Sequence, residues 1–190
     1  MLPSNNPSFS CTPAAHCVYG LTAEQMRVVV NFTSVKDLNA QTQYTLVDFQ
    51  SLIGLPNAYP RNVKNIAIHP NYNPNTNAND IALLFLNTPV TGVVTPIALN
   101  NNSKIPSDNQ TLKAIGAGNT LGEGKLSRDL LEVNLSKVSD QICISFDGQF
   151  FATPDLLCAG YAFGEKPNLI CQGDSGELLL LSVGHYLLNT

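Results

Sequence analysis

A serine between two glycines, directly after an aspartate, is the strongest chemical signal in this sequence. It lies in the stretch at 171–177 (CQGDSGE), where Ser175 suits a nucleophile because Gly173 has no Cβ to block a substrate. Gly173 can adopt backbone angles closed to other residues, so its N–H and that of Ser175 can point at one spot. Two such donors stabilise a developing oxyanion. A serine hydroxyl is a weak nucleophile by itself, so the chain must also supply a base.

Two further residues can supply that base and a group to orient it. His16 lies in the stretch at 11–17 (CTPAAHC), whose small residues allow tight packing around an imidazole. Asp80 opens the apolar run at 80–86, and a carboxylate so close to a buried strand is costly unless it is paired. Each also has a simpler interpretation, His16 as an ordinary structural histidine and Asp80 as a cap at the start of a strand. His69 and His185 are expected to be structural or exposed.

Composition narrows the class of protein. With 190 residues, 44% of them hydrophobic and 13% charged, the chain can bury the core of one domain, or of two small subdomains that share a core. The net charge of −4 and the lack of a basic stripe argue against a nucleic-acid partner. No apolar run reaches the length of a membrane span, and the first residues do not resemble a signal peptide.

Cysteines and glycosylation sequons point to an oxidising compartment. The five cysteines contain no C-x-x-C pair, so we expect no zinc site, and their odd number leaves at least one thiol unpaired within the chain. N-x-S/T sequons start at four asparagines. Together they favour a secreted or extracellular protein. The sequon asparagines are Asn31, Asn101, Asn109 and Asn134.

Short apolar segments separated by turn residues predict an all-β fold, a barrel or a sandwich. Twelve Pro and thirteen Gly break the chain into such pieces. A short helix is expected around Asp140, and the polar stretch at 100–108 (NNNSKIPSD) is expected to link two halves. We expect strands at 27–32, 44–49, 65–69, 80–86, 112–115, 131–135, 156–159 and 178–183.

Seven short stretches, taken in order, resemble the chymotrypsin/trypsin family of serine endopeptidases. Each match is weak alone, but all of them in the family's order are very improbable by chance. The stretches are 14–17 (AAHC), 68–73 (IHPNYN), 79–84 (NDIALL), 94–99 (VTPIAL), 118–120 (GNT), 157–161 (LCAGY) and 171–176 (CQGDSG).

This resemblance implies an all-β, chymotrypsin-like fold of two antiparallel β-barrels with the site between them. It implies one trypsin-like peptidase domain over 1–190, with the first barrel at about 11–100 and the second at about 109–190. Ser175 would attack a peptide carbonyl, His16 would carry the proton, and Asp80 would orient His16. The N–H groups of Gly173 and Ser175 would form the oxyanion hole.

The family also implies further site features. Cys143 and Cys158 match one of its disulfides. Leu169 stands where the floor of the specificity pocket is set, and an apolar residue there argues against cleavage after Lys or Arg. Protein or peptide substrates are expected, and no cofactor or metal.

Several features depart from the family pattern. No Ile-Val-Gly-Gly stretch precedes Cys11, so no ammonium group is expected to pair with Asp174, which we expect to stay out of the interior. Few residues follow Ser175, so the second barrel is expected to be incomplete with an exposed edge. The usual partners of Cys17 and Cys171 are missing, and Glu177 stands in place of a second Gly. These departures predict weak or no labelling of the chain by a fluorophosphonate.

Two functions therefore stay open. One is a serine-type endopeptidase that works through an acyl-enzyme, as the complete set of His16, Asp80 and Ser175 favours. The other is a non-catalytic secreted protease homologue that binds or inhibits another protein, as Glu177 and the missing family features favour.

Overall fold

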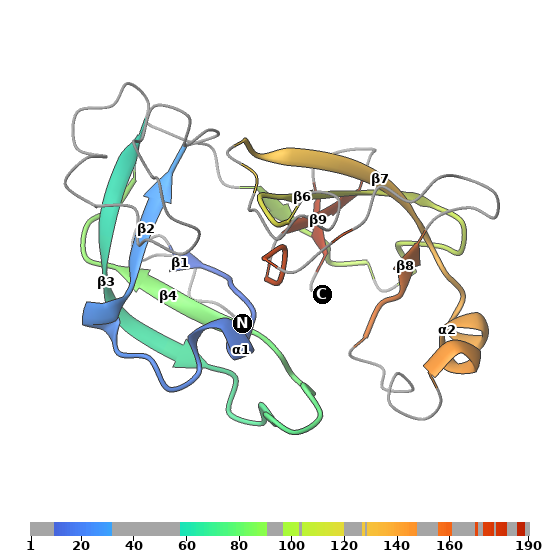
Figure 1. Cartoon of the computed structure of the whole chain (residues 1–190), viewed down its shortest axis with the longest axis horizontal. Helices are drawn as coiled ribbons and strands as arrows, with labels where there is room; N and C mark the ends of the chain where they lie inside the picture. Colours follow the sequence, from blue (N-terminus) through green and yellow to red (C-terminus); the bar gives the residue numbers. More distant parts are fainter. Residues whose placement is uncertain are drawn as a thin grey trace.

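In the computed structural model, β-strands are the main secondary structure of the residues that the structure describes. The structure describes residues 10–31, 58–90, 97–102, 104–119, 127, 129–147, 156–160, 170, 173–176, 178–181 and 186–188. Within these residues the strands form two sheets, which lie side by side in Figure 1. The all-β fold class predicted from the sequence is confirmed.

The first sheet has four antiparallel strands in the order β1-β4-β3-β2. A short helix and a 3-10 turn, α1 and η1, connect β1 to β2. These elements are β1 (Ser10–Cys11), α1 (Ala15–Val18), η1 (Ala23–Gln25), β2 (Arg27–Val30), β3 (Tyr59–Ile68) and β4 (Ala82–Leu86).

One face of the first sheet, together with α1, builds the first core. Along β4 the buried side chains alternate with partly buried ones, because successive side chains of a strand point to opposite faces. The uninterrupted apolar run at 80–86 favours a strand buried on both faces, but only one face of β4 is fully buried. The buried members of this core are Ala15, Val18, Val63, Ala82 and Leu84.

The second sheet has six strands in the order β5-β10-β9-β6-β7-β8. Its pairs are antiparallel except β5 with β10, which run parallel. Its core contains Leu112, Leu135, Leu179 and Leu181. The strands are β5 (Ala98–Leu99), β6 (Thr111–Gly116), β7 (Leu131–Lys137), β8 (Ala159–Gly160), β9 (Leu178–Leu181) and β10 (Tyr186–Leu188).

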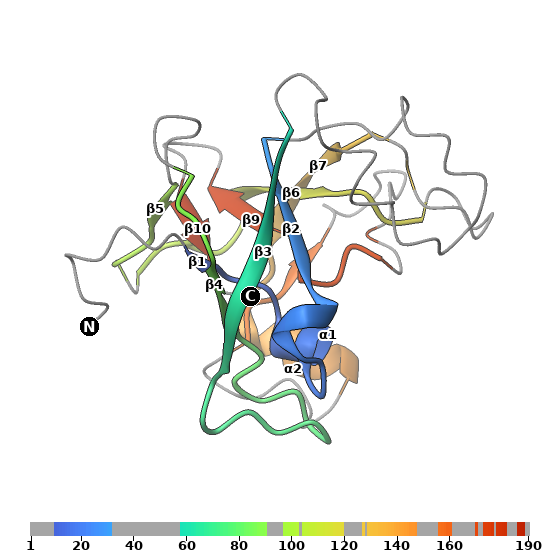
Figure 2. The same cartoon turned by 90° about the vertical axis from the view of Figure 1, so that its left-hand side faces the viewer.

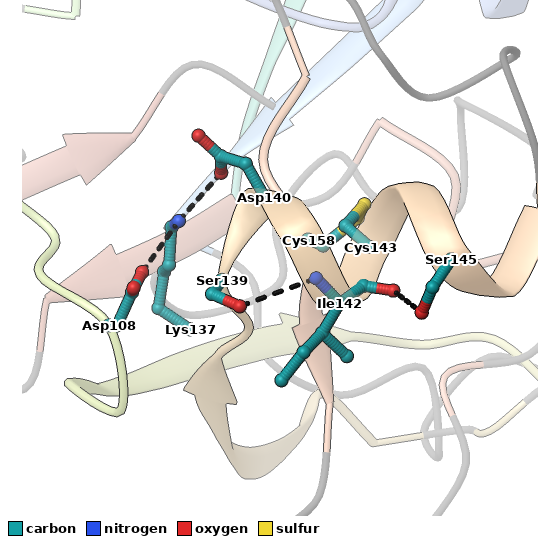
Figure 3. Close-up of a disulfide and its surroundings, with 8 residues drawn as sticks. All are labelled: Asp108, Lys137, Ser139, Asp140, Ile142, Cys143, Ser145 and Cys158. Carbon is teal, nitrogen blue, oxygen red and sulfur yellow. Dashed lines mark hydrogen bonds and ion pairs between the residues drawn. A yellow bond between two sulfur atoms is a disulfide. The ribbon is translucent and has the colours of Figure 1, made fainter.

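Helix α2 (Asp140–Asp147) follows β7 and confirms the helix expected around Asp140. A disulfide joins Cys143 in this helix to Cys158, just before β8, as the family resemblance implied (Figure 3). Lys137 Nζ pairs with Asp108 Oδ1 at 2.9 Å and with Asp140 Oδ1 at 2.8 Å. The helix is thus linked to the second sheet by a disulfide and by the ammonium group of Lys137, which pairs with both carboxylates.

Most expected strands appear, with shifted ends. The strand expected at 65–69 is the last part of β3, which begins at Tyr59, and the strand expected at 156–159 begins only at Ala159. The strand expected at 44–49 lies outside the described residues. The short strands β1, β5 and β10 were not predicted, because two or three residues carry no periodic signal. In the described residues, no helix is long and apolar enough to cross a membrane.

Candidate active site

His16 belongs to helix α1, which lies beside the first sheet (Figure 2). Ala15 is fully buried, and a larger side chain there would collide with the first core. The Pro13 carbonyl accepts a hydrogen bond from the Ala82 N–H at 2.9 Å, which ties the entry of α1 to the start of β4. The small residues before His16 thus allow the helix to lie close against the strand that follows Asp80.

Two hydrogen bonds join His16 to Asp80. The backbone N–H of His16 donates to Asp80 Oδ1 at 2.7 Å, and its ring Nδ1 lies 2.6 Å from Asp80 Oδ2. The carboxylate next to buried β4 therefore has the partner that its position required. When Nδ1–H donates to a carboxylate, Nε2 is the ring nitrogen left to accept a proton. This arrangement fixes both the orientation and the tautomer of the ring.

Tyr72 lies near Asp80 and contacts Tyr19, and sequence reasoning missed both tyrosines. The rings of Tyr19 and Tyr72 meet edge to face, with centroids 5.5 Å apart. Burial raises the pKa of Tyr72, and the nearby Asp80 carboxylate raises it further. Tyr72 therefore keeps its proton at neutral pH. Its place in the family-like stretch at 68–73 was the available signal for it.

The turn that carries Ser175 depends on glycine. Gly173 has φ +101° and Gly176 has φ +81°, in the left-handed region that favours glycine. The unusual backbone expected for Gly173 is thus observed. A Cβ at Gly176 would lie 3.2 Å from the Ala14 nitrogen and 3.3 Å from Cys17 Sγ. The turn that carries Ser175 therefore packs directly against the segment that carries His16.

Asp174 is held by the backbone of a residue far away in sequence. The N–H of Gly118, a buried residue, donates to Asp174 Oδ1 at 2.7 Å. Asp174 itself is partly buried, so the expectation that it stays out of the interior is wrong. The physical reason is that a hydrogen bond from a buried N–H stabilises the carboxylate. The carboxylate in turn satisfies a backbone donor that would otherwise be costly to bury.

Comparison with known proteins agrees with the fold and with the stretches that carry these residues. The model of the Trypsin family matches residues 12–187. The chain belongs to the trypsin family. It is 31% identical over 179 residues to Serine protease filzig of Drosophila melanogaster, an alignment that covers 88% of this chain and 9% of that protein.

A second trypsin-family relative is Serine protease 56 of Mus musculus, 34% identical over 122 residues. That alignment covers 63% of this chain and 20% of the relative. The chain thus spans much less than two thirds of either curated relative. Family membership and the two sheets together support a serine protease fold.

The structure brings Ser175 close to α1 through Cys17. Cys17 Sγ lies 3.5 Å from the Ser175 carbonyl oxygen and 3.4 Å from His16 Nε2. Among the described residues, no hydrogen bond joins the Ser175 hydroxyl to His16. Hydrogen bonds of this kind are often long before a substrate is bound. Cys17 therefore stands at the junction where the two halves of the candidate site meet.

The remaining predicted residues have mixed outcomes. Cys11 is an unpaired thiol in this structure, and burial raises its pKa. Leu169, Cys171 and Glu177 lie outside the described residues.

Proposed function

We propose that this trypsin-family chain is a serine-type endopeptidase domain, with His16, Asp80 and Ser175 as its catalytic residues. The observation that supports this most strongly is the pair of bonds between His16 and Asp80 at 2.7 and 2.6 Å. A carboxylate that holds both the backbone and the ring of one histidine is a positioning device for a general base. Ser175 follows on a turn packed against the same segment.

The proposed reaction has two halves. Ser175 Oγ attacks the carbonyl carbon of a peptide bond while His16 Nε2 takes the hydroxyl proton. His16 then gives this proton to the leaving amine as the C–N bond breaks, and water hydrolyses the resulting ester. Asp80 stabilises the imidazolium in each half, and the N–H groups of Gly173 and Ser175 bind the oxyanion.

Protein or peptide substrates follow from this chemistry. Leu169 is proposed to line the specificity pocket and to favour an apolar residue before the cleaved bond. No cofactor or metal takes part in the proposed steps.

Secretion and glycosylation belong to the same proposal. All four sequon asparagines are exposed, which the attachment of an oligosaccharide requires. The Cys143–Cys158 disulfide agrees with an oxidising compartment. Expression in a secretory host should yield chains that lose mass with peptide-N-glycosidase, and no mass loss would contradict the glycoprotein proposal. The four asparagines are Asn31, Asn101, Asn109 and Asn134.

Hydrolysis of a fluorescent protein substrate tests the endopeptidase proposal. The folded chain should release fluorescence, and Ser175→Ala should lower the rate by about 10⁶-fold, to the background. Circular dichroism of both proteins controls for folding. A folded chain without hydrolysis, or a rate that survives Ser175→Ala, contradicts the proposal.

A second function is favoured by the surroundings of His16 Nε2. This nitrogen contacts Cys17 Sγ at 3.4 Å, on the side where a serine hydroxyl would have to approach. A homologue that binds or inhibits another protein needs no open Nε2. Under this alternative, a secreted partner should bind the chain equally well before and after Ser175→Ala, with no hydrolysis by either.

A further inference from the structure

The contact between Gly118 and Asp174 links two loops of the second half that are 56 residues apart in sequence. Gly118 follows the end of β6, and Asp174 directly precedes Ser175. The distance from Gly118 N to Asp174 Oδ1 is 2.7 Å. Because one peptide bond joins Asp174 to Ser175, any movement of Asp174 also moves Ser175.

The space at Gly118 is already filled by the Asp174 carboxyl group. A Cβ at this position would lie 2.4 Å from Asp174 Cγ and 2.5 Å from each carboxylate oxygen. These separations are far below van der Waals contact, so any side chain must push the carboxylate away. The φ of Gly118 lies outside the left-handed region, so the backbone itself accepts alanine. Close approach, not backbone freedom, is what requires glycine here.

Gly118 is also fixed on its other side. Its carbonyl accepts a hydrogen bond from the Ser127 N–H at 3.0 Å, and the Ala117 carbonyl lies 3.2 Å from the same nitrogen. Ser127 Oγ in turn donates to the Asp129 carbonyl at 2.6 Å. Because these bonds hold Gly118 in place, a new side chain there displaces the Asp174 turn rather than the β6 end.

We propose that Gly118 is a positioning residue for Ser175: the missing side chain admits the Asp174 carboxylate, and the buried N–H holds it. The carboxylate anchors the turn whose N–H groups serve as the oxyanion hole. This proposal rests on the proposed serine-endopeptidase function. It assigns the shape of the turn that carries Ser175 to a residue in a different loop, 56 residues away in sequence from Asp174.

Alanine substitutions at two glycines provide a matched test. A Cβ at Gly160, in β8 of the same sheet, meets its nearest atom, Val138 Cγ2, at 3.6 Å, an ordinary contact. Gly118→Ala should lower kcat for hydrolysis by about 10²-fold, because a small misplacement of reacting groups has effects of this size. Gly160→Ala should change kcat by no more than about twofold. Equal kcat for Gly118→Ala and Gly160→Ala would overturn the proposal.

A double-substitution cycle separates positioning from general destabilisation. Asp174→Ala removes the carboxyl group that a Cβ at residue 118 would strike. In the Asp174→Ala background, Gly118→Ala should therefore produce almost no further loss of kcat. Two losses that multiply fully would show that the residues act independently and would overturn the proposal.

Amide hydrogen exchange tests the contact without any catalysis. The Gly118 N–H should be protected in the wild-type chain and in Asp174→Asn, which keeps an oxygen acceptor, and should exchange much faster in Asp174→Ala. Equal exchange in all three proteins overturns the proposal. If the wild-type chain hydrolyses nothing, the endopeptidase proposal has failed, and this exchange experiment still decides whether Asp174 is held by Gly118.

Discussion

The two halves of the candidate site are built in different ways. In the first half, His16 and Asp80 are joined directly by two hydrogen bonds, and both flank elements of one small core. In the second half, Ser175 lies on a turn shaped by glycines at 173 and 176 and anchored by the Asp174–Gly118 bond. The proposed base is thus positioned mainly by the side chain of Asp80, whereas the proposed nucleophile is positioned by the shape of its backbone turn.

This difference predicts how each half fails. A pair of side chains loses its function when one functional group changes, even if the backbone stays in place. A turn that depends on close packing around glycines is disrupted when a side chain is added at those glycines, although they have no functional group of their own. The following substitutions challenge this contrast, beginning with the largest expected effect.

Asp80→Asn is expected to have the largest effect, through the orientation of His16. An amide that replaces the carboxylate favours the wrong tautomer of the ring, and kcat for hydrolysis should fall by about 10⁴-fold with little change in folding. The measurement is kcat on a peptide substrate. Asp108→Asn removes an exposed carboxylate that pairs only with Lys137 in the described residues, and it serves as the control. A similar kcat for both variants would refute the orienting role of Asp80.

Leu112→Ala tests how much the second half depends on its own core. Leu112 is fully buried against Leu135, Leu179 and Leu181, so the cavity should lower the free energy of unfolding by about 2–5 kcal/mol. Urea unfolding followed by circular dichroism measures this loss. The control is Leu99→Ala, at a side chain that is 49% exposed, where the loss should stay below about 0.5 kcal/mol. Equal losses would mean that the second cluster is not a core.

Gly176→Ala tests the packing of the turn that carries Ser175 against α1. Gly20 and Gly176 have almost the same φ, +80° and +81°, but a Cβ at Gly20 meets nothing within 4 Å. Alanine at Gly20 should therefore lower the free energy of unfolding by about 1 kcal/mol through backbone strain alone. At Gly176 the contacts with Ala14 and Cys17 should add about 1 kcal/mol more. Identical losses in urea unfolding would show that the turn does not press on α1.

Lys137→Met should have the smallest effect, and one that depends on pH. Burial by itself would lower the pKa of Lys137, but hydrogen bonds to Asp140 and Asp108 outweigh it and raise the pKa. A raised pKa in the folded state means that the stabilisation is present below about pH 10 and is lost as the pH rises through the folded-state pKa. Because both carboxylates are mainly exposed, we expect a loss of about 1 kcal/mol at neutral pH.

The measurement is the free energy of unfolding of wild type and Lys137→Met from neutral to strongly alkaline pH. The difference should shrink at the alkaline end. Lys113→Met, which breaks the pair with the exposed Glu132, is the matched control and should show a smaller difference throughout. A difference for Lys137→Met that grows with pH would contradict the assigned ion pairs.

Most features that depend on neighbouring residues, or on a stretch that resembles the family, could be predicted from the sequence. The all-β fold, helix α2, the unusual backbone of Gly173 and the Cys143–Cys158 bridge were all predicted from residue types or matched stretches. The need of Asp80 for a partner followed from the cost of placing a carboxylate beside a buried strand. Such features depend on neighbouring residues or on a stretch long enough to recognise.

What the sequence did not reveal depends on contacts across long separations. Nothing near Gly118 indicates that Asp174 would use its N–H, so the partial burial of Asp174 was missed. The contact of Cys17 with both His16 and the Ser175 carbonyl likewise appears only when the two halves come together. The parallel pairing of β10 with β5 joins segments too short for any pattern to identify.

Labelling with a fluorophosphonate, with the adduct mapped by mass spectrometry, tests the central claim most directly, because only an activated serine reacts. The bond that holds Asp174 removes one reason to expect an unreactive Ser175. The account predicts one adduct, on Ser175, whose formation is strongly slowed by His16→Gln and by Asp80→Asn. A folded chain with no adduct, or an adduct on Ser175 that forms equally fast in His16→Gln, would contradict the claim that His16 and Asp80 activate Ser175.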